Sequence, residues 1–432
     1  KAAARDWGID AAELDIQKRK VLHPWQDYDL VNTLHYIDYN YLALDGYNKR
    51  KIFLSTEFLH GLYDGGLGAG LEDYWLRMWN DPLCAGGFFW VFADESVERT
   101  DRNRELDSDG NHAPDGILGP YHEKEGSFYT IREIWSPVHF EKRYITPAFD
   151  GIFRIENRYF YTNLSQCTFT AEWVKFSGPD EEIQEDVRFT REIKVDLEPG
   201  QKGALKVQLP GDWMAMDVLR INLTDPYGRN LNTWTWPVKD PESSAEEFCQ
   251  SSSPDKPSLN ITDQSLTVTA QNMVYTFQKS DGTIKKIEKN GQIIPLSNGP
   301  VFVSSGKIIK NVSHYFKGND LVIEAVFENG DQIRWIITGD GLLNLELVYE
   351  PANKSLFAGI SFALPERNIA GMRWLGNGPY RVYKNRMKGV AFGLWEKEYN
   401  NTVTGESEFI YPEFKGYHSE VYWVKIIVKD SP

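Results

Sequence analysis

Residues 51–95 have the sequence KIFLSTEFLHGLYDGGLGAGLEDYWLRMWNDPLCAGGFFWVFADE. A short apolar run ends just before Glu57, a glycine-rich loop follows, and residues with helical spacing lead to a second apolar run at 84–92. This order of strand, loop, helix and strand is typical of a parallel α/β sheet. Because chemistry in such sheets lies at the carboxyl ends of the strands, Glu57 is the first candidate for a functional residue.

The rest of residues 1–126 continues this alternation. Apolar runs at 21–25 and 30–36 precede the two already quoted, and residues 2–18 have a helical composition. Four apolar runs separated by helices or long loops predict βα units around a parallel sheet, which amounts to half of an eight-stranded barrel. The polar, glycine-rich stretch at 96–126 predicts a long loop.

The remainder of the chain has the alternating pattern of antiparallel strands. Residues 127–239 predict an immunoglobulin-like β-sandwich. Residues 240–258 are rich in serine, proline and acidic side chains and predict a linker. Residues 259–432 predict a larger antiparallel sandwich, with hairpins at Asn290-Gly291 and Asn329-Gly330. The fold class is therefore multidomain, α/β followed by all-β.

Composition excludes several classes of partner. The formal net charge of −15 argues against a nucleic-acid partner and against an anionic membrane surface, since both need a basic footprint. The sequence contains no run of about 18 apolar residues, so it predicts no transmembrane helix. The three cysteines are scattered and predict neither a disulfide framework nor a zinc site. The aromatic share of 14% fits a sugar-binding cleft and aromatic β-sheet cores equally well.

The residues around Glu57 suit glycoside hydrolysis. A retaining glycosidase uses one carboxylate as nucleophile and a second, about 5 Å away, as acid and base. Tyr36 ends the preceding apolar run and could hydrogen-bond Glu57, His60 follows on the same loop, and Trp90 ends the next run and could form a wall for a sugar ring. The alternative is that Glu57 only caps the segment that follows it.

Three segments resemble glycoside hydrolase family 2, in particular its large multidomain β-galactosidases. The segment from Ser55, STEFLHGLYDGG, with the later GGFFW, is similar to the segment that holds the nucleophile. WLGNGPYRVYKNRMKGVAFGLWEKEYNNTV, from Trp374, and YPEFKGYHSEVYW are similar to two segments of the C-terminal sandwich. The resemblance covers most of the chain. It implies that residues 1–126 are the C-terminal half of a (β/α)8 TIM barrel.

The resemblance also implies roles for individual residues. Glu57 matches the nucleophile, which forms a covalent glycosyl-enzyme intermediate. Tyr36 matches the tyrosine that hydrogen-bonds the nucleophile, although Trp25 could occupy that strand end instead. His60 matches the histidine that contacts the substrate hydroxyls or the transition state, and Trp90 matches the tryptophan of the sugar platform.

Asp115, in PDGILGP, falls where the family has an asparagine that binds the sugar and a sodium ion. An aspartate changes the charge there, so the ion is not carried over. The family's magnesium ligands lie upstream, and no metal site is expected in this chain. A metal site in the polar loop is the alternative, but we favour solvated polar side chains. The residues in question are His112, His122, His139, Asp107, Asp109 and Asp115.

One element of the family's active site has no match. The acid/base is a glutamate in an Asn-Glu pair on the fourth barrel strand, and no Asn-Glu dipeptide occurs in this chain. The resemblance therefore implies a C-terminal portion of a longer enzyme, truncated before the family's last strands. The missing N-terminal part is the expected partner, beside a homo-oligomeric copy. We expect little or no hydrolase activity from the chain alone.

The favoured function is thus part of a retaining exo-acting glycoside hydrolase, a β-galactosidase that cleaves terminal β-galactosides in a β-linked glycan. A relative that resembles β-glucuronidases or β-mannosidases is one alternative. The other is a non-catalytic module for carbohydrate binding or assembly, in which the two β domains bind the sugar. A bacterial periplasm and a cytoplasm fit the composition equally well.

Overall fold

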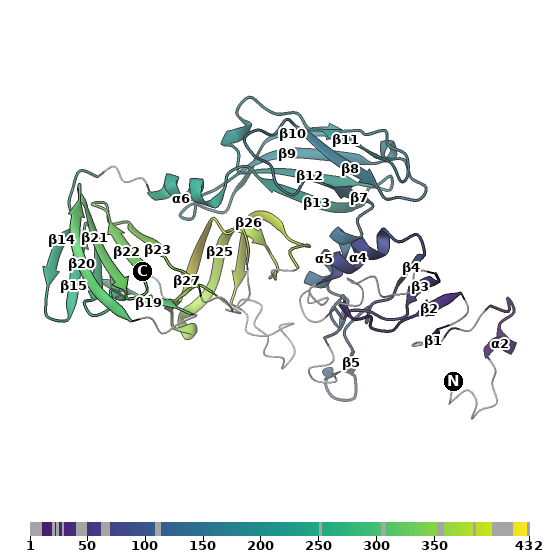
Figure 1. Ribbon diagram of the computed structural model, residues 1–432, viewed down its shortest axis with the longest axis horizontal. Coiled ribbons are helices and arrows are strands. Elements are labelled where there is room, and N and C mark those ends of the chain that lie inside the picture. Colours follow the sequence, from purple (N-terminus) through teal and green to yellow (C-terminus); the bar gives the residue numbers. More distant parts are fainter. Residues whose placement is uncertain are drawn as a thin grey trace. The chain divides into compact units, whose positions relative to one another are not determined.

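The computed structural model describes most of the chain (Figure 1). The described residues are 11–19, 22, 26–27, 30–39, 50–61, 70–108, 114–249, 253–303, 308–351, 358–382, 386–399 and 418–429. The chain forms two compact units, which are described separately. The first contains Lys1–Lys239, Trp374–Glu396 and Asn400–Trp423, and the second contains the remainder. No helix among the described residues is long and apolar enough to cross a bilayer.

The first sheet has the order β1-β2-β3-β4 and begins the first unit. Its strands are β1 (Gln26–Asp27), β2 (Val31–Thr33), β3 (Ile52–Ser55) and β4 (Cys84–Gly87). β2 pairs with β3 in parallel and β3 pairs with β4 in parallel, while β1 is antiparallel to β2. The parallel neighbours expected from the apolar runs are therefore present. Most of the run at 21–25, including Trp25, lies outside the described residues.

Helix α4 (Leu71–Trp79) connects β3 to β4 and covers the sheet. Its buried residues Leu71, Tyr74 and Met78 have a spacing of three and four, so they share one helical face. This face packs against Phe53 and Phe58 to form a small apolar core. The predicted helix thus forms, and its packing fixes the strand that leads to Glu57.

The stretch expected to be a long loop contains a hairpin. β5 (Ser96–Arg99) and β6 (Glu105–Ser108) pair antiparallel. The guanidinium of Arg99 lies 2.8 Å from both Asp101 and Asp107, so ion pairs rather than an apolar face hold the hairpin together. The expectation of a structureless loop was wrong because this hairpin is polar on both sides and shows no apolar alternation.

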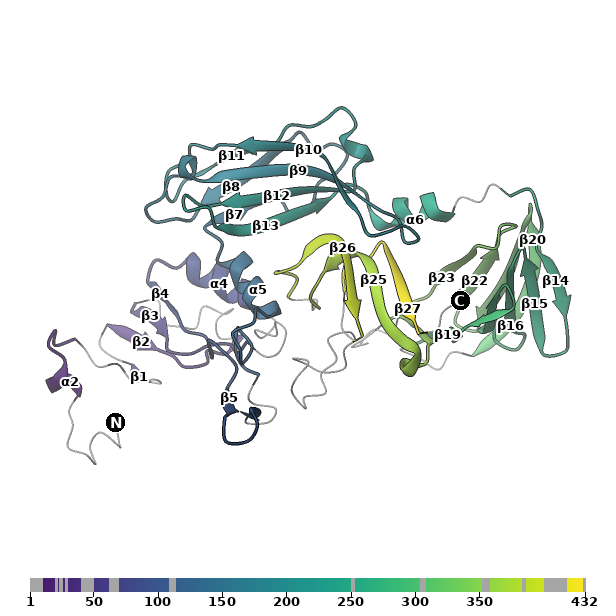
Figure 2. The ribbon, with the colours of Figure 1, turned by 180° about the vertical axis from the view of Figure 1, so that it is seen from behind.

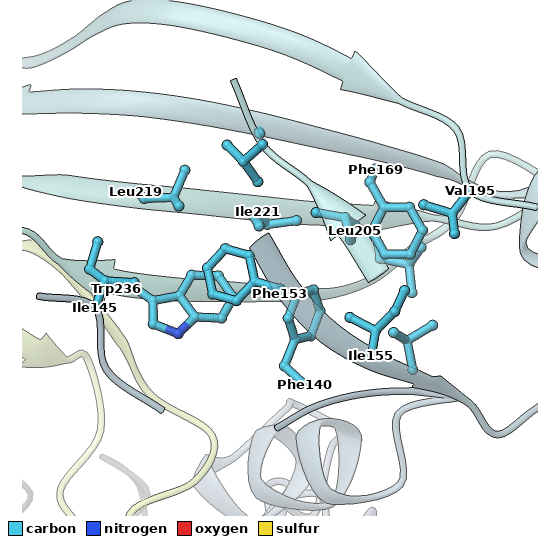
Figure 3. Close-up of a cluster of buried hydrophobic side chains, with 14 of the residues drawn as sticks. Phe140, Ile145, Phe153, Ile155, Phe169, Val195, Leu205, Leu219, Ile221 and Trp236 are labelled. Atoms are coloured by element: carbon cyan, nitrogen blue, oxygen red, sulfur yellow. The ribbon is translucent and has the colours of Figure 1, made fainter. Parts of the chain in front are cut away.

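Helix α5 (Gly126–Ile134) precedes a β-sandwich of two antiparallel sheets. One sheet has the order β10-β9-β12-β13 and the other β11-β8-β7. The strands are β7 (Val138–Phe140), β8 (Ile152–Asn157), β9 (Thr168–Phe176), β10 (Glu185–Ile193), β11 (Lys202–Lys206), β12 (Val218–Thr224) and β13 (Asn230–Pro237). Phe153, Phe169 and Trp236 lie in the core between the sheets (Figure 3), with Trp234 packed against it. Trp234 and Trp236 alternate along β13, so their side chains lie on the same face of the sheet.

The second unit begins with a helix, α6 (Pro241–Cys249), inside the stretch expected to be a linker. A large antiparallel sheet and a four-stranded sheet, β20-β21-β22-β23, enclose its core (Figure 2). The large sheet comprises β14 (Ser258–Ile261), β15 (Ser265–Ala270), β16 (Met273–Gln278), β17 (Ile284–Lys289), β18 (Gln292–Ile294), β19 (Ser297–Phe302) and β24 (Ile360–Ala363). The smaller sheet comprises β20 (Ile309–Lys317), β21 (Asp320–Phe327), β22 (Gln332–Ile337) and β23 (Leu343–Val348).

Both predicted hairpins are present in this unit. Asn290 and Gly291 connect β17 to β18 with φ angles of 53° and 80°, which is the left-handed region that a two-residue hairpin turn needs. Asn329 and Gly330 lie between β21 and β22, which pair antiparallel. The asparagine-glycine signals therefore identified two turns correctly.

Residues near the C-terminus form a further sheet, β26-β25-β27. Its strands are β25 (Ile369–Gly378), β26 (Ala391–Glu398) and β27 (Trp423–Val428). Residues 374–396 belong to the first unit, so the region expected to be one sandwich at 259–432 is divided between the two units. The segment that contains Lys388 packs on α5, because the Lys388 ammonium lies 2.9 Å from Glu133.

Candidate active site

The ends of three neighbouring strands bring the predicted site together. The backbones of His35 and Glu57 form a parallel bridge, and those of His60 and Trp90 form another. The amide of Tyr36 donates to the carbonyl of Glu57 at 2.7 Å. The ladder of the parallel sheet thus continues beyond the strands themselves, and it fixes the residues that follow each strand end.

Tyr36 and Glu57 are in direct contact. The Tyr36 hydroxyl donates a hydrogen bond to Oε1 of Glu57. Desolvation of the hydroxyl, and then the bond to Glu57, raise the pKa of Tyr36 well above its usual value. The hydroxyl therefore keeps its proton and acts as the donor. A bond of this kind stabilises the ionised carboxylate and leaves Oε2 of Glu57 for other partners.

His60 and Asp115 extend this contact into a chain. Nε2 of His60 lies 2.5 Å from the Tyr36 hydroxyl, and Nδ1 lies 3.0 Å from Oδ2 of Asp115. The hydroxyl has a single proton, which goes to Glu57, so Nε2 of His60 must carry a proton and donate it to the hydroxyl oxygen. The four residues form one continuous hydrogen-bonded chain.

The backbone of Asp115 is held as firmly as its side chain. Its carbonyl accepts hydrogen bonds from the amides of Gly61 at 2.8 Å and Val91 at 3.1 Å. A β-carbon at Gly61 would lie 1.8 Å from the carbonyl oxygen of Gly116. Only glycine permits so close an approach of the two backbones. Gly61 thus allows Asp115 to reach the imidazole of His60.

His35 is a member of the site that the sequence did not suggest. Its Nε2 lies 3.8 Å from Oε1 of Glu57, and its Nδ1 lies 3.2 Å from the Thr56 hydroxyl. The available signal was its position directly before Tyr36, at the end of the same apolar run. His35 therefore provides a second polar contact to the carboxylate of Glu57.

Asp94 is a second residue that the sequence did not identify. Its side chain is buried, with 8% of the residue exposed, and its Oδ1 accepts the amide of Gly116 at 2.9 Å. Burial is the main cause that raises the pKa of the Asp94 carboxyl to about 7; the hydrogen bond from Gly116 opposes the shift, and the negative charges of Glu123 and Asp115 add to it. Asp94 fixes the backbone directly after Asp115.

Among the described residues there is no group of three or more His, Cys, Asp and Glu side chains that could hold a metal ion. Asp107 pairs with Arg99, His122 is exposed, and His139 belongs to β7. Burial, with Arg158 and Lys388 adding, lowers the pKa of His139 to about 4. His112 and Asp109 lie outside the described residues.

Asp115 also fits a sodium ion poorly. Its Oδ2 is bonded to His60, and its carbonyl oxygen already accepts two amide protons. Sodium needs several oxygen ligands, and Asp115 has only Oδ1 outside these bonds. No step of the chemistry below uses an ion.

Comparisons with known proteins agree on one class. Residues 305–430 match the family described as β-galactosidase small chain. The chain is 20% identical to a β-galactosidase of Priestia megaterium, over 88% of this chain and 40% of the relative. The chain thus spans less than half the length of this relative. Both sequence matches are to proteins of the β-galactosidase type, which supports a glycoside hydrolase class for this chain.

A solved structure from a study on inhibition of the exo-β-D-glucosaminidase CsxA matches more weakly. It is 11% identical, and the match covers 64% of this chain and 33% of that chain with a TM-score of 0.19. A superposition of that quality supports no statement about this chain.

Proposed function

We propose that this chain contributes the nucleophile to a retaining exo-acting glycoside hydrolase, a β-galactosidase that cleaves terminal β-galactosides. The observation that carries the proposal is the position of Glu57 at a parallel strand end with its Oε1 bonded to Tyr36. In this arrangement Oε2 of Glu57 attacks the anomeric carbon. The new bond replaces the bond to the leaving oxygen, which departs with the electron pair and takes a proton from an acid.

His60, Trp90 and Asp115 have supporting roles in this proposal. Asp115 orients the imidazole of His60 through the bond at 3.0 Å, and on substrate binding Nε2 of His60 exchanges its bond to Tyr36 for one to a substrate hydroxyl near the anomeric carbon. Trp90 ends the neighbouring strand and offers a ring for the apolar face of the sugar. We place these strands in one half of a (β/α)8 barrel, since β2, β3 and β4 are parallel neighbours.

The acid/base carboxylate is proposed to come from another part of the complete enzyme. Asp115 is bonded to His60, and Asp94 is buried against Gly116, so both are engaged elsewhere. Without a proton donor the chain hydrolyses ordinary glycosides slowly, since general acid catalysis contributes roughly a hundred- to ten-thousandfold. The glycosyl-enzyme also hydrolyses slowly, because no base activates the water.

An activated substrate tests Glu57 without requiring the acid. Dinitrophenolate leaves a 2,4-dinitrophenyl β-galactoside without taking up a proton. We expect the chain alone to release about one equivalent in a burst and to gain the mass of one galactosyl group. Peptide mapping by mass spectrometry should place this group on Glu57. Glu57→Gln should abolish both signals, and Glu95→Gln, a neighbouring exposed carboxylate, should leave them unchanged.

The same experiment decides whether the preferred substrate is a β-galactoside, a β-mannoside or a β-glucuronide. The β-galactoside should label Glu57 faster than the corresponding β-mannoside or β-glucuronide. Faster labelling by either of those would replace the galactosidase assignment and keep the nucleophile. Labelling of a different residue, or none with any of the three glycosides, would overturn the role of Glu57.

A further inference from the structure

A cavity lies within the first unit, away from Glu57. Its volume is about 410 Å³, and none of Tyr36, Glu57, His60, Trp90 and Asp115 lines it. Helix α5 forms one wall, the sheet that ends in β13 forms another, and residues 378–380 and 389–395 form the third. Cavities of roughly 300–1,000 Å³ between packed elements are the usual size of small-molecule sites.

Arg132 lines this cavity, and in the part of the chain that the structure describes not all protons of its guanidinium have an acceptor. It lines the cavity from α5, and its Nε and Nη2 donate to the carbonyls of Leu231 at 2.6 Å and Asn230 at 2.9 Å. Among the described residues, Nη1 has no hydrogen-bond acceptor, and the guanidinium has no carboxylate within ion-pair distance. Partial burial lowers the pKa of Arg132. Two guanidinium protons are thus open to an acceptor from a ligand.

Asn232 supplies a second donor without an acceptor. It lines the cavity from the edge strand β13, and only 7% of the residue is exposed. Its amide nitrogen is buried and has no hydrogen-bond partner within the described part of the chain. Buried polar groups normally have partners, so the amide of Asn232 gains one if its side chain turns toward an acceptor in the cavity.

The charges around the cavity favour a neutral ligand. Arg220 lines the cavity and pairs with Glu185 at the wall and with Glu172 behind it. Glu133 lines the cavity and pairs with Lys388. Together with Arg132, these are three basic and three acidic side chains. A balanced set offers both donors and acceptors to hydroxyl groups but gives no net attraction to an anion.

Aromatic rings complete the walls. Tyr129 and Tyr380 stack with their centroids 5.0 Å apart and an angle of 28° between their planes, and both line the cavity. The indole of Trp395 lines it as well and packs over Gly378, where a β-carbon would lie 2.6 Å from the ring. Rings beside open donors and acceptors suit a ligand with an apolar face and several hydroxyls.

We propose that this cavity, defined by Tyr129, Arg132, Asn232 and Trp395, binds a neutral saccharide at a site separate from Glu57. The sugar ring packs against the aromatic wall. Its hydroxyls accept hydrogen bonds from Nη1 of Arg132 and the amide of Asn232. The proposal does not depend on the role of Glu57, so it can be tested independently of the proposed catalysis.

Calorimetric titration of the full chain tests the site. The variant Glu57→Gln/Trp90→Ala serves as background, so that the candidate active site does not contribute. Lactose and cellobiose are the neutral probes, and galacturonic acid is the anionic probe. We expect saturable binding of at least one neutral disaccharide, with a dissociation constant on the order of millimolar.

Matched variants locate the binding. Tyr129→Ala and Arg132→Ala should each weaken it at least tenfold. Tyr161→Ala and Arg188→Ala, exposed residues of the same sandwich outside the cavity, should leave it unchanged. Three results would overturn the proposal: no binding of either disaccharide at about 50 mM, equal binding in the cavity variants, or binding of galacturonic acid alone.

Hydrogen exchange on the unmodified chain keeps the test decisive if a cavity variant fails to fold. Saturating disaccharide should slow exchange of amides in residues 126–134 and 389–395, two segments that contribute residues to the cavity lining. Protection confined to residues 50–61 would place the sugar at Glu57 instead and would rule out the second site.

Discussion

The Tyr36 hydroxyl donates its only proton to Glu57, although the two residues follow different strands. The parallel ladder holds them together, because the amide of Tyr36 also donates to the carbonyl of Glu57. The contact is therefore fixed by the backbone and does not rely on a flexible loop. It keeps one oxygen of the carboxylate occupied and the other available.

Tyr36→Phe should slow the labelling of Glu57 by the activated galactoside by roughly ten- to a hundredfold. A hydrogen bond to a charged group contributes about 1.5–3 kcal/mol, and here it orients the attacking group. The burst rate of dinitrophenolate release measures the effect. Tyr39→Phe is the control, since Tyr39 bonds Asp73 on α4. Equal burst rates in Tyr36→Phe and the wild type would show that the bond is dispensable.

Asp115→Asn should reduce the same burst rate by about tenfold. The amide oxygen of an asparagine can still accept a hydrogen bond from Nδ1 of His60, but it lacks the negative charge of the carboxylate, so the bond is weaker and orients the imidazole toward Tyr36 less firmly. The backbone bonds of residue 115 to Gly61 and Val91 remain, so stability should change little. A large loss of stability without a change in rate would assign Asp115 a structural role.

Asp94→Asn should flatten the pH dependence of stability. The folded-state pKa of Asp94, about 7, lies above the unfolded value of roughly 3.9, so the folded protein binds the proton more tightly. This stabilisation is complete below about pH 4 and is lost as the pH rises through 7, with an upper limit of about 4 kcal/mol.

Urea unfolding at about pH 5 and pH 8 measures this difference. Asp94→Asn should lose less stability than the wild type over that interval, because an asparagine can still accept the amide of Gly116 without titrating. Glu95→Gln serves as the neighbouring exposed control. Parallel pH profiles for the wild type and Asp94→Asn would contradict the shifted titration.

Glu133→Gln should destabilise the first unit by roughly 3 kcal/mol. Burial alone would lower the pKa of Lys388, but Glu133 and Glu72 raise it, and the ammonium lies 2.9 Å from Glu133. Removing the carboxylate leaves a largely buried cation without its main partner. Lys388→Met should cost less, since a flexible apolar side chain replaces the ammonium.

Denaturant unfolding compares these two variants with Glu141→Gln, whose partner Lys202 is 66% exposed. The control should change stability by less than about 1 kcal/mol, as surface pairs do. If Glu133→Gln changed the free energy of unfolding as little as Glu141→Gln does, the pair of Glu133 and Lys388 would not stabilise the protein.

Sequence patterns could anticipate the contact of Tyr36 with Glu57 because parallel strands place successive strand ends at one edge. The turns at Asn290-Gly291 and Asn329-Gly330 could be anticipated from the two residue types alone. Both inferences rest on short patterns along the chain, which a single sequence displays. The proposed role of Glu57 as nucleophile came only from the family resemblance.

Contacts that depend on distant segments could not be anticipated. Asp94 reaches the amide of Gly116 across 22 residues, and no local pattern marks that pair. The β5–β6 hairpin was not predicted because ion pairs of Arg99 stabilise it, and ion pairs leave no apolar alternation in the sequence. The α5 contacts with residues 386–389 connect segments about 256 residues apart.

The packing of α5 has a consequence for the order of synthesis. The guanidinium of Arg386 bonds the Thr130 hydroxyl, and a β-carbon at Gly389 would lie 2.5 Å from the amide nitrogen of Thr130. At roughly 5–20 residues per second, the ribosome needs on the order of 13–50 s to produce Arg386 after Thr130 has been added. During that interval the face of α5 that later contacts Arg386 and Gly389 is not covered by them. The first unit can therefore be completed only late in translation.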